Sequence, residues 1–500
     1  MEKIKIKAKE KNAIIESLKA GIVPRIGLQH IQVGRSDEIK ELIKDYDLIS
    51  NEGAKTRFII GEYGSGKTFF LTLAKLIAHE KNLVVVSADI TTERVLCSSD
   101  GKSQKLFSEL ITNISTKTKP DGGALRSIVE KWATKFLQSY NNVLILKENI
   151  NKELELESLK NDVARYDSSN VLETYINAYQ NGDYINMSQV LRWLRAEYTT
   201  KTKPGGRALR SIVEKWATKI LQSYINKELA SLEKYVSCYD FSNVLATYIN
   251  AYQNGDDIKM SQVLRWLRAE YTTKTEARTD LGVRTIIDDN NFFDYLKLFA
   301  GFVRLAGYSG LIVNIDELAV LARLKSNIRN KNFERILNIV NDSFKGTSEH
   351  IGFIFGGTPE FLEDKYKGLY SYGALESRLA DNPFAKEGMK DLSGPVIRLD
   401  NLSQEELYIL FINIRNVFAE FDETKFLVSE NDIKLFMQWL MNKLGAKSYL
   451  LPRDSIKYFI GLLSQLQNYP ETNISNHLSG IQIQKYEETE DDELVSLTLG

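Results

Sequence analysis

A phosphate-binding loop pattern constrains this chain more than any other feature of its sequence. The pattern of Gly61, four residues, Gly66, Lys67 and Thr68 lies in TRFIIGEYGSGKTFFLTLAKLIAHEKN, between an apolar run that predicts a strand and apolar residues at helical spacing. The glycines let backbone N–H groups turn towards phosphate oxygens, Lys67 can reach the terminal phosphates, and the Thr68 hydroxyl can bind Mg²⁺. The candidate nucleotide-binding residues are Gly61, Glu62, Tyr63, Gly64, Ser65, Gly66, Lys67 and Thr68.

A second apolar run, GLIVNIDEL at Gly310 to Leu318, ends in two acids. On its own it would be read as a buried strand that ends in surface acids. Together with the phosphate-binding loop, it predicts a magnesium contact at Asp316 and a group at Glu317 that orients or deprotonates the attacking water.

Further downstream, HIGFIFGGTPEFL predicts another buried strand that ends at Thr358. If the strands are neighbours in a parallel sheet, Thr358 would lie beside the γ-phosphate and Glu317, although Gly356 and Gly357 could equally form a tight turn. Two arginines are also candidates: Arg378 as an arginine finger acting on a neighbouring subunit, and Arg453 as a phosphate contact in its own chain. The residues alone favour solvated helix positions for both arginines.

The chain also contains a long internal duplication. ALRSIVEKWATK occurs at Ala124 to Lys135 and again at Ala208 to Lys219, and NAYQNGDYINMSQVLRWLRAEYTTKT, ending at Thr202, recurs with two changes, ending at Thr275. Such close identity favours a recent tandem duplication over an old solenoid repeat. Apolar spacing within each copy predicts a small module of three helices.

Both copies lie between Lys67 and Asp316, so we expect them to project from a compact nucleotide-binding sheet. Basic and aromatic residues alternate in each copy, at Arg192, Trp193, Arg195 and Tyr198, and at Arg265, Trp266, Arg268 and Tyr271. This combination could contact a nucleic-acid strand. The favoured interpretation is that the tryptophans belong to the core and the arginines to a solvated face.

Composition excludes few functions. Apolar residues make up 43% and charged residues 26% of the 500 residues, and the net charge of -1 creates no general attraction to nucleic acid or membrane. Two cysteines, Cys97 and Cys238, and four histidines argue against a disulfide framework or a zinc site. With no apolar run of signal-peptide or membrane-spanning length, we expect a cytoplasmic protein.

The motifs together resemble a known family. VGRSDEI (Val33–Ile39), GEYGSGKT, LAGYSGLIVNIDEL, FGGTPEF, ESRL and LPRDSIKYF follow one another as in AAA+ ATPases of the origin-recognition type. The chain is more similar still to the ATP-binding proteins BrxC and BrxD of BREX-type phage-defence systems. The resemblance runs from about Ala13 to about Leu463, with one copy of the repeat excluded.

The resemblance implies roles for individual residues. It assigns Lys67 and Thr68 to Walker A, Asp316 and Glu317 to Walker B, Thr358 to sensor 1, Arg378 to the arginine finger and Arg453 to sensor 2, with Val33, Gly34 and Arg35 near the adenine. Thr358 departs from the asparagine of many AAA+ proteins, which predicts weaker polarisation of water. The implied cofactors are ATP and Mg²⁺. The implied partners are other defence-system proteins, with a helicase or nuclease as candidates, DNA, and further copies of the chain in a homo-oligomer.

The expected fold is α/β, with an AAA+-type P-loop sheet, a long duplicated helical insertion and a C-terminal helical lid. The expected units are residues 1–50 (helical), 51–115 (first core part), 116–277 (insertion), 278–400 (second core part), 401–475 (lid) and 476–500 (acidic tail). The expected function is ATP-driven remodelling of a defence complex. A nucleotide switch or scaffold with little turnover, and an origin-recognition-like DNA loader, are the alternatives.

Overall fold

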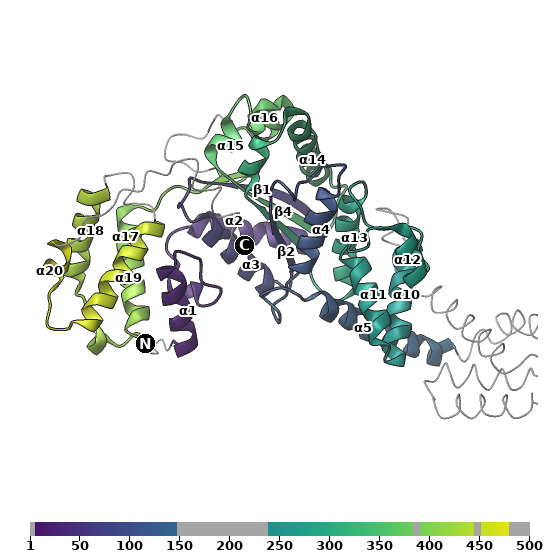
Figure 1. Ribbon diagram of the computed structural model, residues 1–500, viewed down its shortest axis with the longest axis horizontal. Helices are drawn as coiled ribbons and strands as arrows, with labels where there is room; N and C mark the ends of the chain where they lie inside the picture. Colours follow the sequence, from purple (N-terminus) through teal and green to yellow (C-terminus); the bar gives the residue numbers. More distant parts are fainter. Residues whose placement is uncertain (1–5, 148–238, 383, 385–390, 445–451, 480–500) are drawn as a thin grey trace, which may run out of the picture.

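The computed structural model describes residues 6–147, 239–382, 384, 391–444 and 452–479 (Figure 1). The strands are β1 (Ala54–Ile60), β2 (Val84–Asp89), β3 (Leu311–Asp316), β4 (Ile351–Gly357) and β5 (Val396–Arg398). The α-helices are α1 (Ala8–Lys19), α2 (Ser36–Ser50), α3 (Lys67–Glu80), α4 (Lys102–Thr112), α5 (Leu125–Lys147), α10 (Tyr239–Asn254), α11 (Asp257–Leu267), α12 (Lys274–Leu281), α13 (Phe292–Leu305), α14 (Ser326–Lys345), α15 (Pro359–Glu363), α16 (Gly373–Leu379), α17 (Gln404–Phe418), α18 (Glu430–Leu444), α19 (Pro452–Asn468) and α20 (Ile474–Ser479). The 3₁₀ helices are η1 (Leu28–His30), η3 (Leu318–Arg323), η4 (Leu369–Ser371) and η5 (Glu423–Lys425).

The core is a parallel sheet of five strands in the order β2-β3-β4-β1-β5. Apolar residues on both faces of the strands, such as Phe58 and Ile59 on β1, explain why the sequence shows continuous apolar runs rather than alternation. Ile59 packs under α2 and α3, while Phe58 faces the opposite layer with α4, α13 and α14. The prediction of an α/β fold is therefore confirmed as a three-layer arrangement.

The strand order decides which motifs meet. β4 lies between β1, which leads into the phosphate-binding loop, and β3, which ends in Asp316. All three strands run parallel, so Gly61, Asp316 and Thr358 reach the same edge of the sheet. Gly356 and Gly357 belong to β4, where Ile59 pairs with Gly356, so the alternative of a tight turn at the two glycines is wrong.

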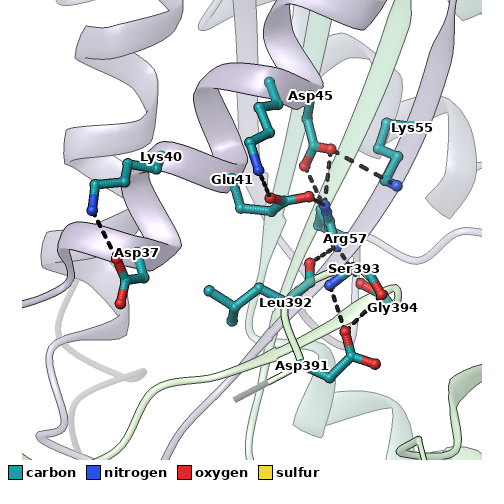
Figure 2. Close-up of polar contacts among 11 residues, drawn as sticks. Asp37, Lys40, Glu41, Asp45, Lys55, Arg57, Asp391, Leu392, Ser393 and Gly394 are labelled. Carbon is teal, nitrogen blue, oxygen red and sulfur yellow. Dashed lines mark hydrogen bonds and ion pairs between the residues drawn. The ribbon is translucent and has the colours of Figure 1, made fainter. Parts of the chain in front are cut away.

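A buried network of ion pairs and hydrogen bonds links β1 to α2 and to the segment before β5 (Figure 2). Arg57, with a side chain 1% exposed, donates from Nε to Asp45 Oδ2 at 2.6 Å and from Nη2 to Asp45 Oδ1 at 2.8 Å, while Glu41 lies 3.3 Å away. Its Nη1 donates to the carbonyls of Leu392 (2.8 Å) and Gly394. Since these partners satisfy the buried guanidinium, Arg57 holds α2 and the segment before β5 against β1.

The described part of the duplicated region combines the two copies. α5 comes from the first copy, whereas α10 and α11 come from the second. Trp132 of α5 packs against Phe302 of α13, with ring centroids 5.6 Å apart, and Arg126 of α5 forms an ion pair with Asp257 of α11 at 3.5 Å. These helices extend to one side of the sheet in Figure 1, yet they share one continuous apolar cluster with it.

Sequence differences between the copies explain this pairing. Phe241 and Ala246 of α10 are 0% and 2% exposed, and Phe241 contacts the rings of Phe299 and Phe302 at 6.0 and 5.6 Å. The matching positions of the first copy are Ser168 and Glu173. Burying Glu173 at the position of Ala246 without a partner would be strongly unfavourable. The helix of the second copy therefore packs on α13 more favourably than the matching helix of the first copy. The second and third helices predicted for the first copy lie outside the described residues.

The basic and aromatic residues of the second copy are structural. Trp266 is 1% exposed and its indole N–H donates to the carbonyl of Thr285 at 3.0 Å. Tyr271 is also buried, while Arg265 and Arg268 pair with nearby glutamates. The prediction of a core position is therefore confirmed for Trp266, whereas Arg265 and Arg268 are half-buried in ion pairs rather than on a freely solvated face. Their counterparts Arg192 to Tyr198 lie outside the described residues.

The N-terminal 50 residues divide between two parts of the molecule. α2 packs on the sheet, whereas α1 packs against α19 and α17 in a second apolar cluster that also contains α18 (Figure 1). This cluster therefore joins the beginning of the chain to its C-terminal helices. Among the described helices, none is long and apolar enough to cross a membrane.

Candidate functional site

The phosphate-binding loop connects β1 to α3, and its backbone has the shape that its glycines predict. Gly66, which precedes α3, has φ of 94°, a conformation that residues with a side chain rarely adopt. Gly61 lies so close to Ser65 that a Cβ would come within 2.5 Å of the serine Oγ. The loop therefore closes tightly around the amino end of a 14-residue helix, where partial positive charge favours an anion.

Two polar groups point into the centre of this loop. The Lys67 ammonium donates to the carbonyls of Gly61 and Glu62 at 2.7 and 2.9 Å. Burial lowers the pKa of Lys67, opposed by the charges of Asp316 and Glu317. The buried Oγ of Ser65 has no hydrogen-bond partner among the described residues. A buried hydroxyl of this kind fits a ligand with phosphate oxygens.

The two acids follow β3 at the same edge. The Asp316 Oδ1 accepts the Glu317 N–H at 2.8 Å, and Glu317 has φ of 58°, a left-handed conformation unusual for a residue with a side chain. Gly356 of β4 makes room for the aspartate, because a Cβ at Gly356 would lie 2.0 Å from Asp316 Oδ1. The sequence analysis left Gly356 open between a strand and a tight turn, and it did not predict that this glycine makes room for Asp316.

The charges at this edge suit a divalent cation. Burial raises the pKa of Asp316, as does the carboxylate of Asp89, its register neighbour on β2, while Lys67 and the Glu317 N–H oppose the shift. A cation would relieve this unfavourable crowding of negative charge. Within the described residues, no group of three or more His, Cys, Asp or Glu side chains could hold a metal alone. That is consistent with Mg²⁺, which commonly binds one or two carboxylates together with substrate phosphates.

A cavity of about 450 Å³ opens from the loop. Its lining includes the loop from Tyr63 to Thr68, together with Glu317 and Arg453. Its apolar lining residues include Leu18, Ile22, Val23, Ile31, Val33, Leu402, Leu410, Pro452 and Ile456. A lining that combines a phosphate-binding loop with apolar side chains, in a volume typical of ligand sites, suits a nucleotide, which has charged phosphates and a largely apolar base.

The segment near the expected adenine site has a second role. Val33 and Arg35 line the cavity. The Arg35 guanidinium also donates from Nη2 to the carbonyl of Ser65 at 3.3 Å and to that of Asp400. Burial lowers the pKa of Arg35, against the charges of Glu38, Glu406 and Asp400. Gly34 lies beneath Glu406, whose Oε1 would be 2.3 Å from a Cβ there. Arg35 therefore joins the N-terminal segment, the loop and the approach to α17.

The remaining candidates occupy different places. Arg453, near the start of α19, lines the cavity. Thr358 is buried at the end of β4, where its hydroxyl accepts the Phe361 N–H at 3.3 Å and caps α15. Arg378 of α16 does not line the cavity. It donates from Nε to Asn341 Oδ1 at 2.7 Å.

The sequence analysis missed the apolar residues that line the cavity. Leu18, Ile22 and Val23 come from α1 and the following loop, and Leu402 and Ile456 come from the other end of the chain. Apolar spacing marks such residues as helix interior, and no local pattern distinguishes a cavity wall from a core position.

The parallel sheet of five strands, the loop and the cavity beside it are consistent with the core of a P-loop NTPase. The family model described as BREX system ATP-binding protein BrxC/D matches residues 6–204 and 197–482, and the chain belongs to this family. The two matched ranges overlap within the duplicated region, where the first copy ends and the second begins. Comparison with curated proteins and with solved structures returned no match.

Proposed function

We propose that this protein is an AAA+-like ATPase that hydrolyses ATP with Mg²⁺ and uses the cycle to remodel a multi-protein, DNA-associated defence complex. The carrying observation is that Lys67, Thr68 and Glu317 line one cavity together with apolar side chains. Nucleotide binding and membership of a BREX system follow from the family. Hydrolysis and remodelling are the parts that we add.

Each polar residue has a task in this proposal. The loop N–H groups and Lys67 hold the phosphates, and Thr68 and Asp316 would hold Mg²⁺. The metal would neutralise charge that develops on the phosphate oxygens. Glu317 orients and deprotonates the attacking water, and Thr358 helps to position that water.

The arginines complete the proposal. Arg453 lines the cavity and would contact phosphates within its own chain. Arg378 is held by Asn341 and by the carbonyl of Ala374, away from the cavity of its own chain. That position supports a role in trans, in which Arg378 stabilises transition-state charge at the site of a neighbouring copy. Full turnover would then need a homo-oligomer.

Steady-state ATP hydrolysis, measured over a range of protein concentrations, tests the proposal. Glu317→Gln should keep nucleotide binding and abolish turnover, whereas Lys67→Ala should lose both. Glu360→Gln is the matched control, because Glu360 is an exposed acid near Lys67 that does not line the cavity. Specific activity should rise with protein concentration if Arg378 acts in trans.

Two results would contradict this proposal. Tight ATP binding without turnover, at every concentration and with the other defence-system proteins present, would indicate a nucleotide switch or scaffold instead. Turnover that survives Glu317→Gln would remove Glu317 from its assigned task.

A further inference from the structure

A basic segment follows the proposed catalytic acid Glu317 and begins at the end of η3. Residues 323–331, RLKSNIRNK, carry four cations and no acid, and the first acid of α14 is Glu334. The segment forms the first turns of α14, with Lys325 and Lys331 exposed. A local positive field therefore exists on a chain whose net charge is only -1.

An exposed tyrosine lies beside this segment. The turn DKYK at residues 364–367 follows α15, and Tyr366 is 86% exposed between two lysines. The Oδ1 of Asp364 accepts the N–H groups of Tyr366 and Lys367 at 2.6 and 3.0 Å, which fixes the turn. Tyr366 therefore projects from an ordered backbone.

One arginine joins the two segments. The Nη1 of Arg329 donates to the carbonyls of Leu324 and Ala322 at 3.1 and 3.4 Å, and its Nη2 reaches the carbonyl of Tyr366 at 3.4 Å. The basic segment and the tyrosine turn therefore form a single surface, which we call the α14 surface.

The acids that flank the turn neutralise the cations of the α14 surface only in part, because each acid already has a partner. Asp364 holds backbone N–H groups, which lower the pKa of its carboxyl group. Glu363 pairs with Arg398 at 2.7 Å, and Glu376 pairs with Lys365.

We propose that the α14 surface binds a single nucleic-acid strand, with its lysines on the phosphates and a base stacked on Tyr366. Clustered cations match the repeating charge of a phosphate backbone, and an exposed aromatic ring between lysines offers a stacking face. An acidic polypeptide would satisfy the lysines but would leave the exposed ring without a matching partner. The buried Trp266 and Tyr271 cannot provide such a face.

The position of the α14 surface suggests how a strand would reach the nucleotide site. η3 runs directly from Glu317 to the basic segment, and α14 extends from that segment to Asn341, which holds Arg378. Strand binding would therefore act on a segment, η3 followed by α14, that begins next to Glu317 and contains the residue that holds Arg378. This inference names a partner for the proposed ATPase and rests on that function only for its use, since binding can be measured without turnover.

The test is fluorescence anisotropy of the full chain with a labelled single-stranded oligonucleotide over a range of KCl concentrations. The triple variant Lys325→Ala, Lys331→Ala, Lys367→Ala should reduce the steepness of the plot of log association constant against log KCl concentration. The reduction should be about 2, because each lost phosphate contact with a single strand accounts for about 0.7. The matched control Lys9→Ala, Lys19→Ala, Lys274→Ala removes the same charge from exposed lysines elsewhere and should leave the slope unchanged.

Tyr366→Ala tests the stacking. Because stacking contributes about 1–3 kcal/mol per base, the variant should bind the single strand about 5- to 100-fold more weakly and a duplex almost as well as the parent. The proposal would be overturned if binding did not depend on salt, or if the triple variant and its control lost binding equally. It would also be overturned if Tyr366→Ala had no effect, or if the chain bound polyglutamate with equal affinity. ATP turnover that persists in such a result would leave the proposed function standing.

Discussion

Trp132 and Trp216 occupy the same position in two identical twelve-residue segments, so they offer a direct test of how the duplicated region folds. Trp132 is 0% exposed, with the rings of Phe136 and Phe302 at centroid distances of 5.4 and 5.6 Å. Trp132→Ala would remove a fully enclosed indole, and the rigid helices around it can refill only part of the space.

The expected loss follows from this burial. Replacing a buried tryptophan with alanine costs about 3–5 kcal/mol. The indole N–H of Trp132 has no hydrogen-bond partner among the described residues, so packing accounts for the loss. Because each ~1.4 kcal/mol is a factor of ten, opening of the helices around this position should become about 100- to 3,000-fold more frequent.

Hydrogen exchange read by mass spectrometry measures this opening. The peptide to follow is α13, Phe292–Leu305, because its sequence is not repeated and it packs against Trp132 through Phe302. Trp132→Ala should make α13 exchange faster. Trp216→Ala should leave its exchange unchanged, because that substitution removes no atom from the contact.

The reverse result would refute the reasoning. If Trp216→Ala exposed α13 and Trp132→Ala did not, the second copy's helix would fill the position beside α13. Smaller, similar effects of both substitutions would mean that the two copies share that position.

Three further predictions follow from described contacts. Asp45→Ala should lower the free energy of unfolding by about 3–5 kcal/mol in chemical denaturation, because it leaves the buried charge of Arg57 without its main partner. Gly356→Ala should displace the carboxylate of Asp316 and weaken Mg²⁺-dependent ATP binding in titration calorimetry, while ATP binding in EDTA changes little. Burial lowers the pKa of His79 from 6.5 to about 4, so between these pH values the unfolded chain binds more protons than the folded chain. The free energy of unfolding should therefore fall as pH is lowered through this window. His79→Gln should reduce this dependence of the free energy of unfolding on pH, measured by urea denaturation at several pH values.

Local sequence was enough to predict the phosphate-binding loop of this site because the requirements of the loop are local. A loop that surrounds phosphates needs glycines at fixed spacing before a helix, and Lys67 and Thr68 follow within the same segment. The apolar runs before Gly61, at Leu311–Asp316 and before Thr358 likewise predicted strands, since buried parallel strands are apolar on both faces. These same segments carry the family resemblance that the family model confirms.

Tertiary structure decided what depends on contacts between distant residues. Leu18 and Ile456 line the same cavity from opposite ends of the chain, and the guanidinium of Arg35 reaches the carbonyl of Ser65, contacts for which the sequence has no local signal. The two copies of the repeat look interchangeable along the chain. The buried positions of Phe241 and Ala246, which Ser168 and Glu173 of the first copy would fill poorly, distinguish the helix that completes the core.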